Sequence, residues 1–514
     1  MLKRLLKSVS AIFIGQFLNI AGNLALVPLF LSHWSTGVYG EWMALSAVVA
    51  YFGVSDLGMN AAAGNEMTAA YACGDLKRYR YLQGSAMAFY VGMAFSISLI
   101  LGILTVFLPI SAWIGIRQIP PTIAAPVVWI LAATVLWQMP ASLLRCVYRT
   151  TGDLAATQWF WNIQFIGSLA VTVAVLLLHG TILQLALWSA VPTILITGVI
   201  WFSLRRSHPE LLPKLSEARY EGLKELMNPS LLFGLIMLSA ALTLQGPVLI
   251  VSSALGGIAV ALLVTTRTLA NFVVQAIKVL QSALWPELTR LDALGDERSL
   301  QFGHRLFSVS AVAISAAFAG ALWFEGAGVI AVWTGGKLTP DVWLLRFFLL
   351  ALILQAPWLA SSLFTTANNQ HRRLAYSYVI SAILTLVAIA FLLHPCGLIA
   401  VPLGAIAGEA VANYHFVVKD ACNVLKENYL RFAVRLWAGV GVISCASWSA
   451  GYIGHAIAVG PAPLRWIEVG TLTTLAAILS AWTFGLLSVD RSRLLRAQKT
   501  RWNALRASSG NQTA

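Results

Sequence analysis

Long apolar blocks separated by short polar segments run along the whole chain. The blocks are roughly 20 residues long, the length that an α-helix needs to cross about 30 Å of hydrocarbon. Alternating apolar segments of about 10 residues, which are typical of membrane β-barrels, do not occur. The pattern predicts an all-α, polytopic membrane protein with about 14 transmembrane helices. We place the spans near residues 8–32, 40–61, 84–108, 123–146, 158–178, 183–203, 229–252, 259–283, 306–331, 342–366, 375–393, 398–418, 433–455 and 466–487.

The composition agrees with this pattern. Of the 514 residues, 59% are hydrophobic and 11% are charged, whereas a soluble domain carries about 25% charged residues. The N-terminus resembles a signal peptide, but its apolar run continues from Val9 to Leu31, which is too long for a cleaved signal and suits a first span. The five cysteines show no metal-ligand or paired spacing, so no metal site and no exported disulfide framework are predicted.

The basic residues gather on one side of the predicted spans. With the N-terminus inside, 28 of the 34 Lys and Arg residues lie in the N-terminal tail, the even-numbered loops and the C-terminal tail. This asymmetry is the positive-inside rule, and it predicts a multi-pass protein of the bacterial cytoplasmic (inner) membrane with both termini cytoplasmic. The net charge of +14 is then explained by contact with anionic membrane lipids, and no nucleic-acid partner is predicted. The remaining six basic residues are four on the outer side, Arg117, Lys337, Arg346 and Arg465, and two within a span, Arg267 and Lys278.

Several landmarks recur at offsets of 221, 217 and 215 residues, each at the same place in the predicted topology. They are Gly74-Asp75 with Gly295-Asp296, Gln138-Met139-Pro140 with Gln355-Ala356-Pro357, and Leu177-Leu178-His179 with Leu392-Leu393-His394. Together they predict two six-helix lobes. Because each repeat has an even number of spans, the lobes are related by a pseudo-twofold axis along the membrane normal.

These landmarks divide the chain into five parts. The N-terminal lobe is 1–206, an amphipathic cytoplasmic linker is 207–228, and the C-terminal lobe is 229–420. Two additional transmembrane helices occupy 421–487, and 488–514 is a basic cytoplasmic tail. Within the linker, leucines set among charged residues predict an interfacial amphipathic helix over 210–228.

Span eight carries a polar stripe of Arg267, Asn271, Gln275, Lys278 and Ser282, at steps of 4, 4, 3 and 4 residues. These steps place the side chains on one helical face. Ionisable groups within a span are costly and usually face a cavity or a partner, so we predict that the first four of these residues bind substrate. The alternatives are a buried structural pair with a carboxylate for Arg267 and a snorkelling side chain for Lys278.

Span one repeats the pattern with amides, because Gln16, Asn19 and Asn23 share a face. These residues are further candidates for substrate binding, and interhelical hydrogen bonding is the alternative.

Other polar residues within the spans lead to three further expectations. Asp56 and Glu409 are candidate ion-coupling carboxylates, with a structural hydrogen bond as the alternative. Arg145 and Arg149 are placed at the cytoplasmic edge of span four, where they serve topology. Glu325 is placed at the outer interface.

The first hairpin resembles that of bacterial polysaccharide (O-antigen type) flippases, which belong to the multidrug/oligosaccharidyl-lipid/polysaccharide exporter (MOP) superfamily. The resemblance is carried by Gly37-Val38-Tyr39-Gly40-Glu41-Trp42, Tyr51, Asp56-Leu57-Gly58, Asn65 and Gly74-Asp75. It implies export of a lipid-linked oligosaccharide for polysaccharide biosynthesis (lipopolysaccharide and O-antigen), with spans one, two, seven and eight around the cavity between the lobes.

Three functions are weighed on these residues. A flippase for an undecaprenyl-diphosphate-linked oligosaccharide, working by alternating access, fits best, because a basic cavity lowers the cost of moving an anionic head group. A cation-coupled multidrug extruder of the same superfamily should favour acidic groups instead. A membrane polysaccharide polymerase or ligase needs a large outer loop, and the longest one here has about 14 residues (Pro109 to Thr122). Such an enzyme is considered instead as a partner of the flippase.

No nucleotide-binding loop, catalytic triad or zinc cluster occurs in the sequence. The chain is therefore predicted to be no enzyme and to need no cofactor.

Overall fold

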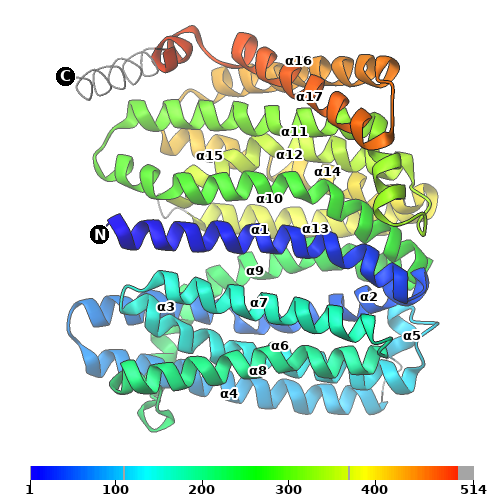
Figure 1. Ribbon diagram of the computed structural model, residues 1–514. Coiled ribbons are helices and arrows are strands. Elements are labelled where there is room, and N and C mark those ends of the chain that lie inside the picture. The colour runs from blue at the N-terminus through cyan, green and yellow to red at the C-terminus, as the bar shows by residue number, and fades with distance from the viewer. Residues whose placement is uncertain (1, 108–109, 368–370, 496–514) are drawn as a thin grey trace, which may run out of the picture. The chain divides into compact units, whose positions relative to one another are not determined.

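The computed structural model describes residues 2–107, 110–367 and 371–495, and these are helical apart from short connections (Figure 1). Within them, 13 helical stretches are long and apolar enough to cross a membrane. One stretch, Arg372–Val424, has 53 residues, enough for two spans. It bends at η4 (Gly397–Ile399), between α13 (His371–Cys396) and α14 (Ala400–Ala412). The prediction of an all-α polytopic membrane protein is confirmed.

The chain forms two compact units. The first comprises residues 1–275, 330–344 and 372–409, and the second comprises 276–329, 345–371 and 410–514. The lobe and linker boundaries predicted from the sequence remain predictions. The other α-helices are α1 (Leu2–His33), α2 (Thr36–Phe52), α3 (Met59–Ala72), α4 (Leu76–Phe107), α5 (Ile110–Ile114), α6 (Pro121–Thr150), α7 (Leu154–Leu177), α8 (Ile182–Ser207), α9 (Tyr220–Leu255), α10 (Gly257–Ala293), α11 (Glu297–Trp333), α12 (Val342–Ala367), α15 (Phe416–Val424), α16 (Tyr429–Ile457) and α17 (Ala462–Ser480).

Close helix pairs build the first unit. Helix α1 packs along α7, α6 along α8, and both α2 and α3 along α9. Small residues allow this close approach, as is usual between membrane helices, where lipid removes the hydrophobic drive for association. At Gly40 of α2, an added Cβ would lie 1.7 Å from the carbonyl oxygen of Gly257 at the start of α10. The backbones of α2 and α10 therefore touch at this point, and a larger residue would force them apart.

The second predicted span is interrupted. Instead of one helix over 40–61, the chain forms α2, a 3₁₀ turn η1 (Gly53–Asp56) and α3. Leu57 and Gly58 are left-handed, with φ of 48° and 75°. Glycine is required at position 58 because an added Cβ would lie 2.5 Å from the carbonyl oxygen of Ser230 in α9. A broken helix at membrane depth is tolerated only where protein or water surrounds it, so the break is a candidate functional feature.

Gly-Asp pairs close three helix-to-helix turns in the same way. In each pair the glycine has a φ between 66° and 84°, and the aspartate accepts a hydrogen bond of 2.9 to 3.0 Å from the backbone N–H three residues later. This is a left-handed helix end followed by an N-cap. The pairs are Gly74-Asp75, Gly152-Asp153 and Gly295-Asp296. The first and third are the landmarks of the predicted repeat. The second pair is not one of these landmarks but has the same geometry. A Gly-Asp pair therefore indicates this type of turn wherever it occurs, as well as a position in the repeat.

The predicted amphipathic helix over 210–228 is wrong as a single helix. The segment contains two short 3₁₀ turns, Pro209–Leu211 and Leu215–Glu217, and α9 begins only at Tyr220. Pro213 explains the interruption, since proline lacks an N–H and disfavours a helical residue before it.

Candidate functional site

The polar stripe of span eight lies on α10. Arg267 is half-buried, and its Nη1 donates a 2.6 Å hydrogen bond to the carbonyl oxygen of Leu244 in α9. Within residues 2–107, 110–367 and 371–495, no carboxylate pairs with Arg267, and the side chains of Asn271, Gln275 and Lys278 make no hydrogen bond. The alternative of a structural ion pair for Arg267 therefore has no support in the described chain.

The amides of α1 remain beside the main helix contact. Asn23 Nδ2 donates a 3.0 Å hydrogen bond to Asn19 Oδ1, so these two side chains share a face and bind each other within one helix. The contact between α1 and α7 runs through Gly15 and Gly22, where added Cβ atoms would collide with α7 side chains. By helical periodicity, Asn19 lies one turn from both glycines, at the edge of this seam, and Gln16 and Asn23 lie further from it.

Asp56 lies at the break between α2 and α3, and it is 8% exposed. Its Oδ1 accepts hydrogen bonds from the Tyr90 hydroxyl and, at 3.2 Å, from the Asn60 N–H. Among the described residues no basic side chain is bonded to it. A buried carboxylate that is held by neutral donors and sits at a helix break can change its protonation without breaking an ion pair, which suits the predicted coupling role.

Arg145 lies in the last two turns of α6 and is 2% exposed, so its side chain is inside the protein. Its guanidinium lies 4.0 Å from the centre of the Trp161 ring, and Nη1 donates a 3.3 Å hydrogen bond to Gln164 Oε1. Its Nε and Nη2 have no partner in the described chain. Helices α7 and α8 pack on α6 and cover this turn, and the expected position at the cytoplasmic edge remains a prediction. The spacing of Arg145 from Ser142 and Gln138, which places all three on one helical face, is the signal that could have indicated its buried position.

Glu41, which lies in the hairpin that carries the family resemblance, anchors a loop. The side chain is 1% exposed and accepts four hydrogen bonds of 2.7 to 3.0 Å from the backbone N–H groups of Arg117, Gln118 and Ile119. These hydrogen bonds and the Gly40–Gly257 contact give a structural explanation for Gly40 and Glu41 in the hairpin motif. The bonds hold the 115–120 connection onto α2.

The two remaining acidic residues have different environments. Glu409 is half-buried in α14, and its coupling role remains a prediction. Glu325 is 2% exposed and accepts hydrogen bonds from His455 Nδ1 at 2.6 Å and from Arg465 Nε at 3.0 Å. Glu325 therefore belongs to a buried ion pair with residues of α16 and the start of α17, and its expected interfacial position remains a prediction.

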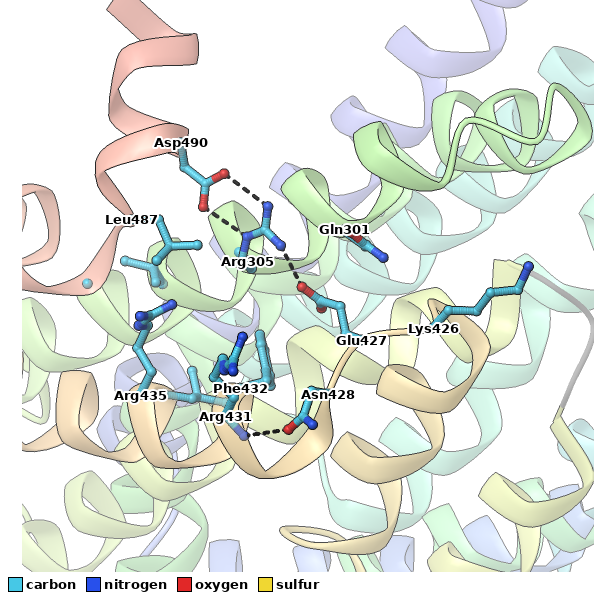
Figure 2. Close-up of a pocket in the computed structure, with 13 residues that line it drawn as sticks. Gln301, Arg305, Lys426, Glu427, Asn428, Arg431, Phe432, Arg435, Leu487 and Asp490 are labelled. Carbon is cyan, nitrogen blue, oxygen red and sulfur yellow. Dashed lines mark hydrogen bonds and ion pairs between the residues drawn. The ribbon is translucent and has the colours of Figure 1, made fainter.

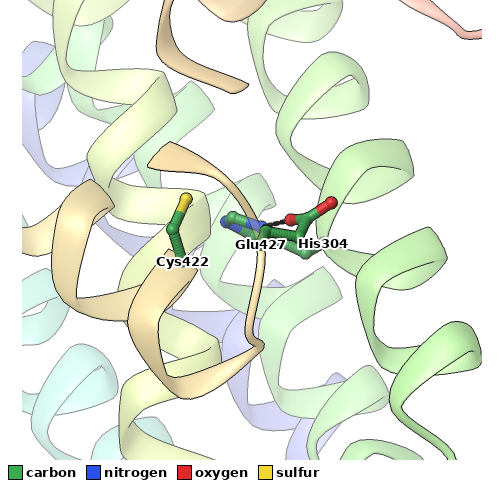
Figure 3. Close-up of side chains that lie close together, drawn as sticks. All are labelled: His304, Cys422 and Glu427. Atoms are coloured by element: carbon green, nitrogen blue, oxygen red, sulfur yellow. Dashed lines mark hydrogen bonds and ion pairs between the residues drawn. The ribbon is translucent and has the colours of Figure 1, made fainter. Parts of the chain in front are cut away.

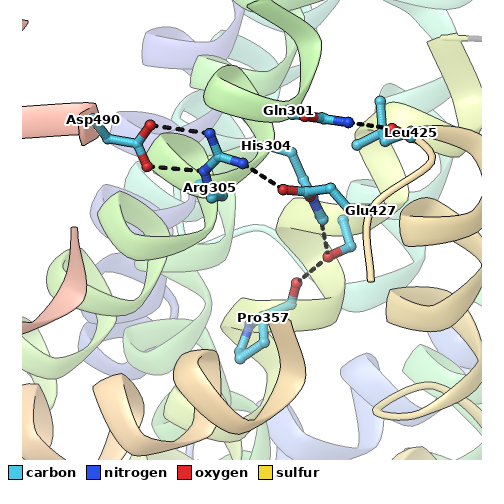
Figure 4. A network of polar contacts seen from close by, with 8 residues as sticks. Gln301, His304, Arg305, Pro357, Leu425, Glu427 and Asp490 are labelled. Carbon is cyan, nitrogen blue, oxygen red and sulfur yellow. Dashed lines mark hydrogen bonds and ion pairs between the residues drawn. The ribbon is translucent and has the colours of Figure 1, made fainter. Parts of the chain in front are cut away.

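A charged network in the second unit was not predicted. Arg305 of α11 donates two hydrogen bonds of 2.9 and 3.0 Å to Asp490 and one of 2.6 Å to Glu427 (Figure 4). His304 Nδ1 lies 3.1 Å from the other oxygen of Glu427. Burial opposes the charge of Glu427, but the hydrogen bonds from His304 and Arg305 outweigh burial and lower its pKa below the ordinary value.

His304, Cys422 and Glu427 bring their potential metal-binding atoms within 4.8 Å of one another (Figure 3). However, His304 Nε2 lies 3.0 Å from Ser361 Oγ, so both ring nitrogens already have hydrogen-bond partners. A cation on Glu427 would also meet the guanidinium of Arg305, which shares that carboxylate. The three side chains are therefore better explained as a hydrogen-bonded packing cluster than as a metal site.

Comparisons with known proteins define the class of the fold. No family model and no curated protein matches the sequence. Among solved structures, the lipid II flippase MurJ in an inward closed conformation has a TM-score of 0.66 at 12% identity, over 93% of this chain and 98% of that one. An inward-facing multidrug resistance transporter of the MATE family has a TM-score of 0.64 at 14% identity, over 84% of this chain and 98% of that one.

A third solved structure is a MOP-superfamily transporter from Pyrococcus furiosus. It is described as having a binding pocket of reverse polarity that suggests a different function. It has a TM-score of 0.57 at 13% identity, over 85% of this chain and 96% of that one. The present chain is thus a multi-pass membrane protein with the fold of the MOP-superfamily transporters.

Proposed function

We propose that this protein is a flippase that moves an undecaprenyl-diphosphate-linked oligosaccharide across the bacterial cytoplasmic membrane by alternating access, as a step in polysaccharide biosynthesis. The observation that carries the proposal is the state of Arg267. Its guanidinium lies in a membrane span and binds one backbone carbonyl, with no carboxylate partner in the described chain. An uncompensated charge at this depth costs about 2.5–3.5 kcal/mol on insertion scales, so it calls for water or an anionic ligand.

The chemistry of the stripe suits a diphosphate. The planar guanidinium of Arg267 can bind phosphate oxygens bidentately, and its charge acts strongly where water is scarce. Asn271 and Gln275 have amide groups without a hydrogen-bond partner in the described chain, and these can bind sugar hydroxyls; Gln16 of α1 offers another. Lys278 adds a second positive charge further along α10.

The fold supports transport, since the structural neighbours are described as transporters and one of them as a lipid II flippase. Two lobes of six helices would give alternating access, with both termini on the cytoplasmic side. Asp56 and Glu409 would couple the cycle to an ion. Asp56 also favours the second candidate, a cation-coupled multidrug extruder, because it is a buried carboxylate without a basic partner in the described chain.

The test is surface glycan display in a strain that lacks its own flippase, with membrane protein levels matched by blot. We expect Arg267→Ala to lower display about 10- to 100-fold, the range for loss of a hydrogen bond to a charged group. Arg267→Lys should retain part of the activity because it keeps the charge and loses the fork. Lys278→Ala should have a milder effect.

The matched control is Arg290→Ala. Arg290 also lies on α10, but it is exposed and paired with Glu287 at 2.6 Å. Full display from this control together with loss in Arg267→Ala would support the proposal. Normal display from the Arg267→Ala, Lys278→Ala double variant would reject a substrate role for the stripe. Export of cationic drugs by the wild type, without glycan display, would favour the extruder.

A further inference from the structure

The second unit contains a cavity of about 440 Å³. It is bounded by α11, the connection between α15 and α16, the first turns of α16 and the residues that follow α17 (Figure 2). Its charged lining residues are Arg305, Lys426, Glu427, Arg431, Arg435 and Asp490. The positive-inside pattern places these chain segments at the cytoplasmic side of the membrane.

The charges of this lining do not balance. Arg305 is held by both acidic residues, Asp490 and Glu427. Lys426 pairs with Glu297, which lies outside the lining. Arg431 and Arg435 are left, and within the described chain neither has an ion pair. Counted with Glu297, the four basic and three acidic side chains leave one net positive charge.

Arg431 and Arg435 also lie near the N-terminus of α16, where the helix dipole adds to the positive charge. They lie four residues apart on α16, whose N-cap Asn428 accepts a 3.0 Å hydrogen bond from the Arg431 N–H. The first turn of α16 contains no acidic residue. Arginines in the first two turns therefore sit at the positive end of the helix dipole, where an anion would be favoured and a cation is not. This arrangement becomes favourable once an anion occupies the cavity.

Apart from Gln301 and Asn428, the rest of the lining is apolar. Val309, Phe432, Leu436 and Leu487 face the same cavity. Phe432 is held in place by stacking on His304, with the ring centres 4.5 Å apart. A free inorganic anion gains nothing from such a wall, whereas the glycerol and first methylenes of a lipid do. The cavity therefore fits an amphiphile with an anionic head.

We infer that this cavity binds the phosphate of an anionic phospholipid of the cytoplasmic leaflet, with Arg431 and Arg435 as the phosphate-binding residues and the apolar wall against the glycerol end. Basic pockets between membrane helices on the cytoplasmic side are suited to such head groups. The site is separate from the α10 stripe and does not depend on the substrate proposed for the protein. Its occupant would stabilise the connection between α11, α16 and the chain after α17.

The experiment uses the full chain, purified in neutral detergent and stripped of lipid. Unfolding is followed by the fluorescence of its 19 tryptophans. The probes are phosphatidylglycerol, phosphatidylcholine and inorganic phosphate, all at one ionic strength. We expect phosphatidylglycerol alone to raise the melting temperature of the wild type. In Arg431→Ala, Arg435→Ala the same rise should need about 30-fold more lipid.

Two further variants keep the result interpretable. The double variant Arg431→Lys, Arg435→Lys retains the charge and should show an intermediate lipid requirement. It keeps the test usable if the double alanine variant fails to fold. Arg205→Ala, Arg206→Ala removes two other arginines, at the end of α8, and should respond like the wild type.

Three results would overturn the inference. One is an unchanged lipid response in both variants of Arg431 and Arg435. Another is an equal loss in the α8 control, which would indicate a general charge effect. The third is an equal melting shift with inorganic phosphate, which would assign the cavity to a free anion.

Discussion

Arg305 and Arg267 lie on consecutive long helices, α11 and α10, but their partners differ completely. Arg305 binds two carboxylates through three hydrogen bonds of 2.6 to 3.0 Å. Arg267 binds one backbone carbonyl, and the described chain offers it no carboxylate. A charge that is fully paired inside a protein is part of the fold, because breaking the pair leaves an uncompensated partner. A charge that is unpaired is available to a ligand.

Two residues of the same type are thus expected to serve different purposes: Arg305 stabilises the fold, and Arg267 serves transport. Mutation of Arg305 should affect folding first, and any loss of transport should follow the loss of protein. Mutation of Arg267 should affect transport in a protein that still folds. The acidic residues of the chain can be sorted in this way, with Glu325 on the paired side and Asp56 on the unpaired side.

The largest effect is expected for Arg305→Ala. It leaves the carboxylates of Glu427 and Asp490, which are 10% and 3% exposed, without their main cation. The free energy of unfolding should fall by about 3–5 kcal/mol. Denaturant unfolding in detergent measures this, and Arg290→Ala, at an exposed pair, should stay within about 0.5 kcal/mol. A stable Arg305→Ala protein would show that the network does not support the fold.

Arg145→Met should change the free energy of unfolding in the opposite direction to Arg305→Ala. The variant removes two buried nitrogen atoms, Nε and Nη2, that lack partners in the described chain, and it keeps an unbranched apolar side chain in the same space. We expect the free energy of unfolding to rise by about 1–3 kcal/mol, the usual penalty of an unsatisfied buried group. The same denaturant assay applies. A fall in stability would mean that water or an anion satisfies Arg145 in the native protein, which would move it to the functional side of the comparison.

Asp56→Asn tests the unpaired carboxylate. The amide oxygen can still accept from Tyr90 and from the Asn60 N–H, so folding should be preserved. Gradient-driven uptake in proteoliposomes should fall about 10-fold or more, since the amide cannot bind or release a proton near neutral pH. Glu66→Gln on α3, whose carboxylate pairs with Arg78, is the control for loss of a negative charge. Full uptake by Asp56→Asn would remove this residue from ion coupling.

The smallest expected effect is a change of stability with pH that arises from the network of His304, Arg305, Glu427 and Asp490. The pKa of Glu427 is lowered in the folded state from an ordinary value of 4.5. A lowered carboxyl pKa stabilises the fold fully above the unfolded-state value, and this stabilisation is lost as the pH falls through the folded-state value. Melting temperatures between pH 7 and pH 3 should therefore converge for the wild type and Glu427→Gln as the pH falls. A constant difference would contradict the assignment.

The outline of the candidate site could be predicted because it depends on one helix at a time. The common face of Arg267, Asn271, Gln275 and Lys278 follows from helical periodicity alone. Periodicity does not show that Arg267 lacks a carboxylate partner in the described chain, since any such partner would come from another helix. Likewise, the interruption at Asp56 was missed because Leu57-Gly58 is a weak local signal, and its close contact with Ser230 involves residues 172 positions apart.

The sequence by itself determined that the protein is helical and about how many spans it has. It also determined which polar side chains lie on the same face of a helix. These properties depend on apolar length and residue spacing, which are local quantities. Only the tertiary structure decided which charges are paired. Arg305 meets Glu427 and Asp490 across 122 and 185 residues, and Glu325 meets Arg465 across 140. Pairing depends on which helices pack together, and residues so far apart along the chain leave no periodic signal of their contact.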